Sequence, residues 1–290
     1  MLRLALPKGS LEDQTLKIFK EADLEVIRGF RDYNPSINDP RIKKIKILRP
    51  QEIPKYVEDA YFDIGISGWD WINESEANVE IVADLPYSKQ SSNMVGLVVA
   101  VAEDSNIKDP EEIKPGSRVT TEFPNLTKKY FEKLGIPVEI FFSYGASEAK
   151  IPELMDVVID LTETGATLRK NRLKIIGTIL KSSTKLLANK ESFKDPEKKK
   201  AIEEIKTLLL GVIEARGKVL LSMNVSENKL ENLISILPSM KDPTVSKLFG
   251  SDYYAISTVV PKKNVNILIP KLKEFGAEDI LEINISKIVK

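Results

Sequence analysis

Strand-like and helix-like runs alternate through the first two-thirds of the chain, and this alternation limits the possible fold more than any other feature. Residues 2–7 are predicted as a strand, residues 10–22 as an amphipathic helix capped by Ser10, and residues 44–49 and 62–67 as further strands. Strands separated by helical crossovers lie side by side in parallel. The pattern therefore predicts an α/β fold with a mostly parallel sheet, and a second unit of the same kind beginning near Asn93.

The end of the chain follows a different rhythm. A long helix is predicted over roughly 196–216, and from residue 218 the order becomes strand, helix, strand, strand, helix, strand. This order is typical of a ferredoxin-like α+β domain. Earlier in the chain, residues 146–155 are predicted as a helix and residues 173–190 as two strands joined at a turn.

The composition removes several kinds of chemistry. The chain has 290 residues but no cysteine and no histidine, which excludes disulfides, thiolate and imidazole metal ligands, and histidine-dependent triads. Lysine plus arginine and aspartate plus glutamate both number 43, so a general nucleic-acid-binding surface is not expected. Catalysis would have to use carboxylates, Lys, Arg, Tyr, hydroxyls, amides or a hard cation. With no membrane-length apolar run and no signal-peptide pattern, a cytoplasmic location is expected.

The segment TETGAT, residues 162–167, follows the strand-like run DVVID and is the first candidate site. Gly165 permits a turn closed to other residues, and successive amides in such a turn can converge on an anion. Thr164 and Thr167 add hydroxyl donors, while Asp160 and Glu163 suit the hydroxyls of a sugar phosphate. A helix cap that binds nothing has the same spacing, and the spacing alone favours neither interpretation.

Three more predicted strand ends carry polar or glycine residues. Lys8, Gly9 and Ser10 follow the first strand, Arg49 ends another, and GISGWD at residues 65–70 ends a third. Taken singly, these could be a capped helix with a solvated lysine, a surface ion pair and a plain turn. Because ligands of parallel α/β sheets sit beyond the carboxyl ends of strands, their agreement predicts a cleft for a polyanionic ligand between two lobes.

Seven segments, taken in order, resemble one enzyme family over nearly the whole chain. They closely resemble the long form of ATP phosphoribosyltransferase, the first enzyme of histidine biosynthesis. The most specific match is VIDLTETGATL, and PTVSKL marks the long form. The segments are ALPKGSL, LRPQEIP, GISGWD, RVTTEFPNLTKKYF, GASE, DVVIDLTETGATLRKNRL and MKDPTVSKL.

The resemblance implies a fold and a reaction. The reaction joins ATP to 5-phosphoribosyl 1-pyrophosphate, with Mg²⁺ accompanying the pyrophosphate. The implied catalytic body is bilobed and like a periplasmic binding protein: residues 1–92, completed by about 182–216, form one lobe, and residues 93–181 the other. Residues 217–290 would form an ACT-type domain that binds histidine as inhibitor. The family's long form is a homohexamer that exchanges with a dimer.

The resemblance also implies roles for individual residues. The phosphoribosyl-pyrophosphate site would comprise Asp160, Glu163, Thr164, Gly165, Ala166 and Thr167. The ATP site would comprise Lys8, Gly9, Ser10 and Arg49. Lys8, Arg49 and Asp70 would act in catalysis, with Asp70 touching substrate or magnesium, and Thr244 would touch the effector. The residues that order magnesium are not implied.

Two segments depart from the family pattern, and two other functions stay open. The segment after GASE is shorter and poorer in glycine than is usual, and residues 29–41 form a longer polar stretch that suits a surface loop or a mobile lid. A prephenate-dehydratase-like enzyme has a similar layout, but its Thr-Arg-Phe signature does not occur here. A non-enzymatic regulatory subunit that binds a small anion would show no turnover.

Overall fold

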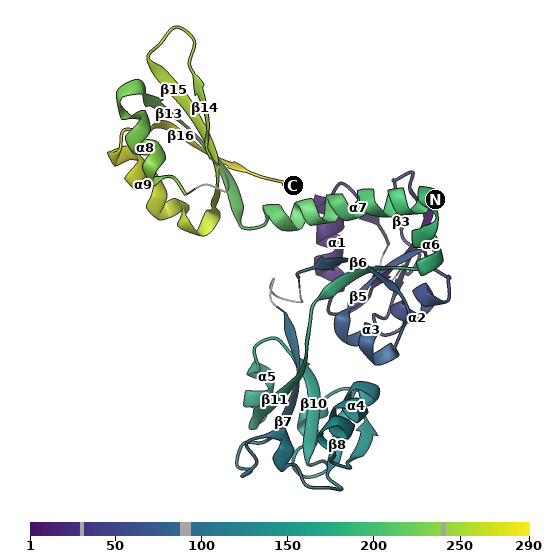
Figure 1. Cartoon of the computed structure of the whole chain (residues 1–290). Coiled ribbons are helices and arrows are strands. Elements are labelled where there is room, and N and C mark those ends of the chain that lie inside the picture. The colour runs from purple at the N-terminus through teal and green to yellow at the C-terminus, as the bar shows by residue number, and fades with distance from the viewer. Residues whose placement is uncertain (30–31, 88–93, 239–241) are drawn as a thin grey trace. The chain divides into compact units, whose positions relative to one another are not determined.

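The computed structural model describes residues 1–29, 32–87, 94–238 and 242–290 (Figure 1). The chain forms two compact units, Met1–Lys206 and Thr207–Lys290, and the division falls inside the long helix α7 (Pro196–Ala215). The expected start of the second α/β series at Asn93 lies outside the described residues. In the described part of the chain, no helix is both long and apolar enough to cross a membrane.

The first unit contains two five-stranded sheets, and we call the one that includes the N-terminal strand lobe I. Its strand order is β4-β1-β5-β12-β6. The neighbours β4, β1 and β5 are parallel, as predicted, whereas β12 runs antiparallel to both β5 and β6. Its strands are β1 (Leu2–Pro7), β4 (Ile42–Leu48), β5 (Ile64–Gly68), β6 (Glu80–Leu85) and β12 (Thr184–Ala188). Its helices are α1 (Glu12–Glu21), α2 (Ile53–Glu58), α3 (Trp69–Ser75) and α6 (Lys190–Lys194), and a small hairpin joins β2 (Val26–Ile27) to β3 (Ser36–Ile37).

The second sheet of this unit defines lobe II, with strand order β11-β7-β10-β8-β9. The strands β10, β8 and β9 are parallel, and β7 runs antiparallel to both of its neighbours. Lobe II comprises β7 (Val95–Ala102), β8 (Arg118–Thr121), β9 (Glu139–Phe142), β10 (Val157–Thr162), β11 (Leu173–Ser182), α4 (Pro124–Leu134) and α5 (Ala166–Lys170). The helix α4 starts with proline and ends before Gly135 at φ +71°, which are the signals that predicted it.

The two predicted strands in residues 173–190 both form, but they belong to different sheets. The strand β11 ends at Ser182 in lobe II, and β12 begins at Thr184 in lobe I. The chain therefore passes from one lobe to the other at Ser183. Lobe I is completed only by this returning segment, since β12 lies between β5 and β6.

Two local predictions are wrong. Ser10 does not cap the first helix: α1 begins at Glu12, and the Glu12 carboxylate accepts a hydrogen bond from the Gly9 amide at 3.2 Å. Residues 146–155 do not form an α-helix. They form a short 3₁₀ helix, Ser147–Lys150, followed by turns. Pro152 has no amide hydrogen and disfavours a helical conformation at the residue before it, so an apolar pattern there cannot continue as a helix.

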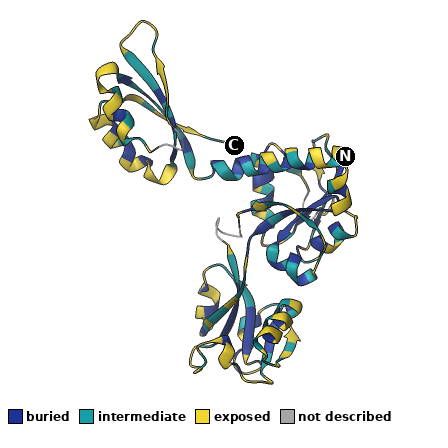
Figure 2. Ribbon diagram, in the orientation of Figure 1, coloured by how far each residue is buried: buried dark blue, intermediate teal, exposed yellow. Residues whose placement is uncertain are grey.

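The second unit has the predicted βαββαβ order. Its antiparallel sheet has the order β14-β15-β13-β16, the arrangement of a ferredoxin-like fold. Along β13, buried residues alternate with partly exposed ones, so one face of the sheet packs under the helices (Figure 2). The elements are β13 (Lys218–Ser226), α8 (Leu230–Ile236), β14 (Thr244–Lys247), β15 (Tyr253–Pro261), α9 (Val265–Glu274) and β16 (Glu278–Asn284).

Candidate functional site

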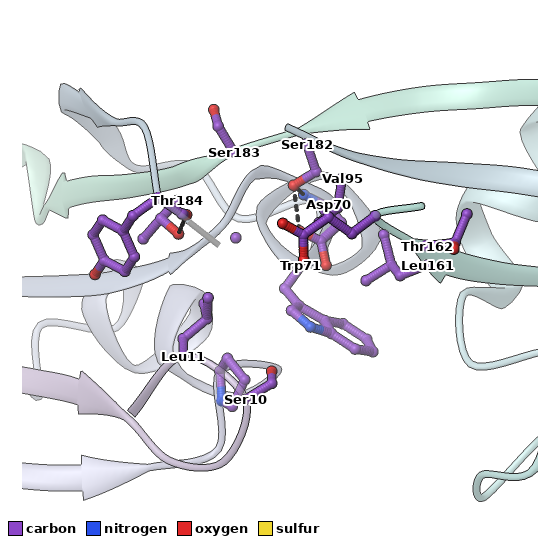
Figure 3. A pocket seen from close by; sticks show the side chains of 14 residues that line it. Ser10, Leu11, Asp70, Trp71, Val95, Leu161, Thr162, Ser182, Ser183 and Thr184 are labelled. Carbon is purple, nitrogen blue, oxygen red and sulfur yellow. Dashed lines mark hydrogen bonds between the residues drawn. The ribbon is translucent and has the colours of Figure 1, made fainter. Parts of the chain in front are cut away.

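A cavity of about 230 Å³ in the first unit is lined by residues from both lobes (Figure 3). Most of its walls come from the ends of strands and the loops that follow them, as expected for a ligand site of a parallel α/β sheet, whereas Val95 and Thr184 begin their strands. Lobe I and its returning strand contribute Ser10, Leu11, Pro50, Gly68, Asp70, Trp71, Ser183 and Thr184, with Tyr87 just beyond β6. Lobe II contributes Val95, Leu161, Thr162, Glu163 and Ser182.

Asp70 is the buried charged group of this cavity. It lies in the first turn of α3 and is 3% exposed. The Ser182 hydroxyl donates to its carboxylate and accepts a hydrogen bond from its amide at 3.0 Å. Burial raises the pKa of the carboxyl. Gly68 makes room for it, because a Cβ at position 68 would lie 2.1 Å from the Asp70 carboxylate.

The loop after β10 reaches the cavity through Thr162 and Glu163. Gly165 has φ +71° and directly precedes α5. The Gly165 amide donates to the Thr162 hydroxyl at 2.8 Å, and the Ala166 amide donates to the Thr164 hydroxyl at 3.4 Å. Two of the amides expected to converge on an anion are thus held by hydroxyls of the same loop.

Asp160 lies in β10, just before this loop. Burial, with smaller contributions from Glu148 and Glu122, raises the pKa of its carboxyl to about 6. The Leu161 amide donates to this carboxylate at 2.7 Å, which opposes the shift. Burial also raises the pKa of Glu122, while the charges of Arg49 and Lys150 act to lower it. Arg49 directly follows β4, and its charge acts on Glu122, a carboxylate of lobe II.

The residues after β1 divide between the cavity and its surroundings. Ser10 lines the cavity, whereas Lys8 does not. The Lys8 ammonium donates to the Tyr33 hydroxyl at 2.6 Å and lies 4.4 Å from the centre of the Tyr33 ring. Tyr33 belongs to the longer polar stretch 29–41, so this segment reaches a predicted site residue. Gly9 has φ +85°, a conformation that favours glycine.

Of the residues predicted from the sequence, Ser10, Asp70 and Glu163 line the cavity together. Other predicted residues are not part of its wall. Lys8, Gly9, Asp160 and residues 164–167 lie within a few positions of these three in the chain, and Arg49 directly precedes the lining residue Pro50. Thr244 begins β14 in the second unit and is exposed. Sequence reasoning missed Thr162, Trp71 and Tyr87. It also missed the hydroxyl run Ser182–Ser183–Thr184, although three hydroxyls at the junction of two predicted strands are a readable signal.

Comparison with known proteins extends over the whole chain. A family model described as ATP phosphoribosyltransferase matches residues 49–211, and one described as HisG, C-terminal domain, matches residues 215–287. The ATP phosphoribosyltransferase of Pelotomaculum thermopropionicum is 46% identical over 99% of this chain and 99% of its own length. That of Chlorobium chlorochromatii is 45% identical over 100% and 98%. A chain of the ATP phosphoribosyl transferase (HisG:HisZ) complex from Thermotoga maritima aligns with a TM-score of 0.62 at 28% identity, covering 72% of this chain and 99% of that chain.

Proposed function

The chain belongs to the ATP phosphoribosyltransferase family, and from this premise we propose how its residues carry out the reaction. The enzyme joins ATP to 5-phosphoribosyl 1-pyrophosphate and releases pyrophosphate, which is the first step of histidine biosynthesis. The observation that carries the assignment of residues is the cavity, where Asp70 of lobe I and the 162–163 end of the TETGAT loop line one space.

The chemistry suits a chain without histidine. N1 of the adenine attacks the anomeric carbon of the ribose, and the bond from that carbon to the pyrophosphate oxygen breaks. The transition state resembles an oxocarbenium ion, so positive charge develops on the sugar while negative charge leaves with the pyrophosphate. Orientation of the two substrates and neutralisation of this charge supply most of the rate, and no strong base is required.

The TETGAT loop is proposed to bind the 5′-phosphate of the ribose. The Thr164 and Thr167 hydroxyls and the amides of residues 165–167 supply donors at the start of α5. The Gly165 and Ala166 amides would exchange their present hydroxyl acceptors for phosphate oxygens. Asp160 or Glu163 would accept hydrogen bonds from the ribose hydroxyls.

The cationic side chains of Lys8 and Arg49 suit the negative charges of the pyrophosphate and the ATP phosphates. Lys8, with Gly9 and Ser10 beside it, and Arg49 would neutralise these phosphates, and Lys8 would leave Tyr33 to do so. Asp70, held by Ser182, would contact a substrate. Among the described residues, no cluster of three or more carboxylates could hold a metal ion. Mg²⁺ commonly takes one or two carboxylates, with phosphate oxygens and waters, so Asp160 and Glu163 suit an ion that arrives on the pyrophosphate and neutralises its charge.

Regulation and assembly are proposed from the family's long form. The second unit would bind histidine as feedback inhibitor, with Thr244 touching it, and the enzyme would assemble as a hexamer in the cytoplasm. The catalytic lobes would comprise residues 1–92 with about 182–216, and residues 93–181, leaving 217–290 as the regulatory domain. The sheet membership supports this division, because β12 returns to lobe I after β11 has completed lobe II.

The test of the function is one assay. The purified protein is mixed with ATP, phosphoribosyl pyrophosphate and magnesium, with and without histidine, and the absorbance of phosphoribosyl-ATP is followed. Product that histidine suppresses is the expected result. Product without suppression would remove the regulatory proposal alone. A folded protein that makes no product would instead favour a small-anion-binding regulatory subunit.

A glycine substitution tests the phosphate loop. A Cβ at Gly165 would lie 2.9 Å from Arg169 and 3.2 Å from Ile175, at φ +71°. Gly165→Val should therefore weaken binding of phosphoribosyl pyrophosphate at least about 10-fold by calorimetry. Gly116→Val is the matched control, because Gly116 has φ +80° but nothing lies within 4 Å of its Cβ position. Equal affinity in the two variants would remove the loop from the site.

A further inference from the structure

The short helix α3 presents residues to both lobes of the first unit. Trp69 and Ile72 pack in the apolar cluster of lobe I that contains Ile53 and Leu187. Trp71 packs instead against the lobe II cluster and stacks on Phe123, with ring centroids 4.2 Å apart. Residues three apart lie on the same side of a helix, so Glu74 faces lobe II with Trp71.

Glu74 makes three hydrogen bonds to the first turn of α4. Its two carboxylate oxygens accept from the amides of Asn125 and Leu126, each at 2.9 Å. Its carbonyl oxygen accepts from the Asn125 side-chain amide at 2.9 Å. The first amides of a helix have no partner within the helix, so a carboxylate from the other lobe supplies what α4 itself cannot.

We call these hydrogen bonds between Glu74 and α4 the joint. The joint is buried and polar, so it forms only when α3 and α4 are correctly placed. Glu74 is 7% exposed and hydrogen-bonds to α4 of lobe II, whereas Asp70 of the same helix hydrogen-bonds to Ser182 at the end of β11. A carboxylate shielded from water makes strong hydrogen bonds only when its oxygens and the facing N–H donors are correctly placed. By contrast, the nearby pair of Glu76 and Lys129, at 2.5 Å, joins two side chains that are 55% and 60% exposed. Such an exposed pair contributes little.

We propose that Glu74 is a positioning residue for phosphoribosyl transfer, which fixes the placement of lobe II against lobe I. Asp70 lies one turn before Glu74 in α3, and Trp71 both lines the cavity and stacks on lobe II. One helix therefore carries both Asp70, the buried acid of the cavity, and Glu74. The hydrogen bonds of Glu74 to α4 set the distance between Asp70 and the lobe II wall that contains Thr162. The kinetic part of the inference rests on the proposed function, whereas the structural part does not.

Loss of the joint has a defined kinetic consequence. In the proposed site, phosphoribosyl pyrophosphate takes donors for its 5′-phosphate from lobe II and donors for its pyrophosphate from lobe I. Only molecules with correctly placed lobes bind it, so its apparent dissociation constant rises as that fraction falls. We expect Glu74→Ala to raise KM for phosphoribosyl pyrophosphate by about 10-fold or more, with kcat changed by less than about threefold. Glu74→Gln keeps one of the two oxygen acceptors and should recover part of this loss. Glu76→Ala, at the end of the same helix, is the control and should behave as the wild type.

A distance measurement separates positioning from a merely structural role. The chain has no cysteine, so Lys43→Cys on β4 of lobe I and Lys133→Cys on α4 of lobe II can carry a pair of spin labels without background. Both positions are exposed. We expect a narrow distribution of label distances with Glu74, a broad one in Glu74→Ala and an intermediate width in Glu74→Gln.

Each outcome decides the proposal. A broad distribution with raised KM in Glu74→Ala, both reversed in part in Glu74→Gln, supports it. An unchanged distribution in a folded Glu74→Ala variant overturns it, even if the variant is less stable, because Glu74 would then be only a cap for α4. If the wild type transfers no phosphoribosyl group, the proposed function is wrong, and the label distances alone decide whether Glu74 fixes the lobes.

Discussion

At the scale of single residues, the first unit keeps several acids where water is scarce. Burial raises the pKa of Asp70, Glu74 and Asp160, since the charged form loses hydration that few hydrogen bonds replace. Asp63 shows the opposite effect in a buried position. Arg3, Lys198 and Ser192 donate to it and hold the pKa of its carboxyl far below the usual range. The ion-paired Asp63 therefore stabilises the fold, whereas Asp70 and Asp160 accept from a hydroxyl and a backbone amide and are proposed to meet a ligand.

The Asp160 carboxyl leads to a prediction about pH. Its pKa in the folded protein, about 6, lies above its ordinary value of 3.8, so the folded state holds this proton more tightly than the unfolded state does. The resulting stability is full below about pH 4 and is lost as the pH rises through 6. Asp160→Asn should therefore raise the free energy of unfolding by up to about 3 kcal/mol at neutral pH, with no gain near pH 4.

Urea unfolding of both proteins across this pH range measures the effect. Phosphoribosyl transfer should fall in the same variant, because an amide cannot accept from the ribose hydroxyls as a carboxylate does. A variant that is no more stable at neutral pH would mean that the carboxylate is already compensated in the folded protein. A stable variant with full activity would take Asp160 out of the site.

At the scale of elements, the two lobes use the same arginine–aspartate pairing. Arg3 is the second residue of β1, and Arg118 is the first residue of β8. The amide and guanidinium of each arginine donate to an aspartate that directly precedes a neighbouring parallel strand: Asp63 before β5 and Asp156 before β10. The amides of Asp63 and Asp156 in turn donate to the carbonyl oxygens of Arg3 and Arg118, at 2.9 and 3.0 Å. The environments differ, because the Asp63 side chain is 1% exposed and that of Asp156 is 42% exposed.

This repetition provides a matched pair of variants. Asp63→Asn leaves Arg3 and Lys198 without their buried counter-charge and should lower the free energy of unfolding by about 3–5 kcal/mol. Asp156→Asn removes an equivalent but exposed pair and should cost less than about 1 kcal/mol. Urea denaturation at neutral pH compares them. Equal losses would show that burial of Asp63 does not set the strength of its pairing.

The elements also show how far the sequence could predict the structure. Alternating patterns located β1, β4, β5 and the βαββαβ order of the second unit, because element type depends on neighbours in the chain. Partner choice depends on distant residues. Nothing local to residues 184–188 indicates that they run antiparallel between β5 and β6, and Ser182 meets Asp70 across 112 positions. The sequence therefore predicted site residues at the strand ends but missed the wall formed by Ser182, Ser183 and Thr184.

At the scale of the whole molecule, the chain contains two units with separate apolar cores. The second unit has its own cluster beneath α8 and α9, which includes Leu221, Met223 and Leu272. The Thermotoga maritima chain is covered over 99% of its length by 72% of this chain, a share close to the 206 of 290 residues in the first unit. The proposed catalytic and regulatory roles fall on different units and can be tested separately.

Hydrogen exchange of the intact protein tests this assignment with one ligand at a time. A ligand slows exchange most where it stabilises the folded state against local opening. Phosphoribosyl pyrophosphate with Mg²⁺ should protect peptides that cover the end of β10 and the start of α5, and leave β14 and β15 unchanged. Histidine should protect peptides around Thr244, where β14 pairs with β15, because an exposed edge strand opens readily until a ligand covers it. Protection by histidine confined to the first unit would place the effector in the catalytic body and remove Thr244 from its site.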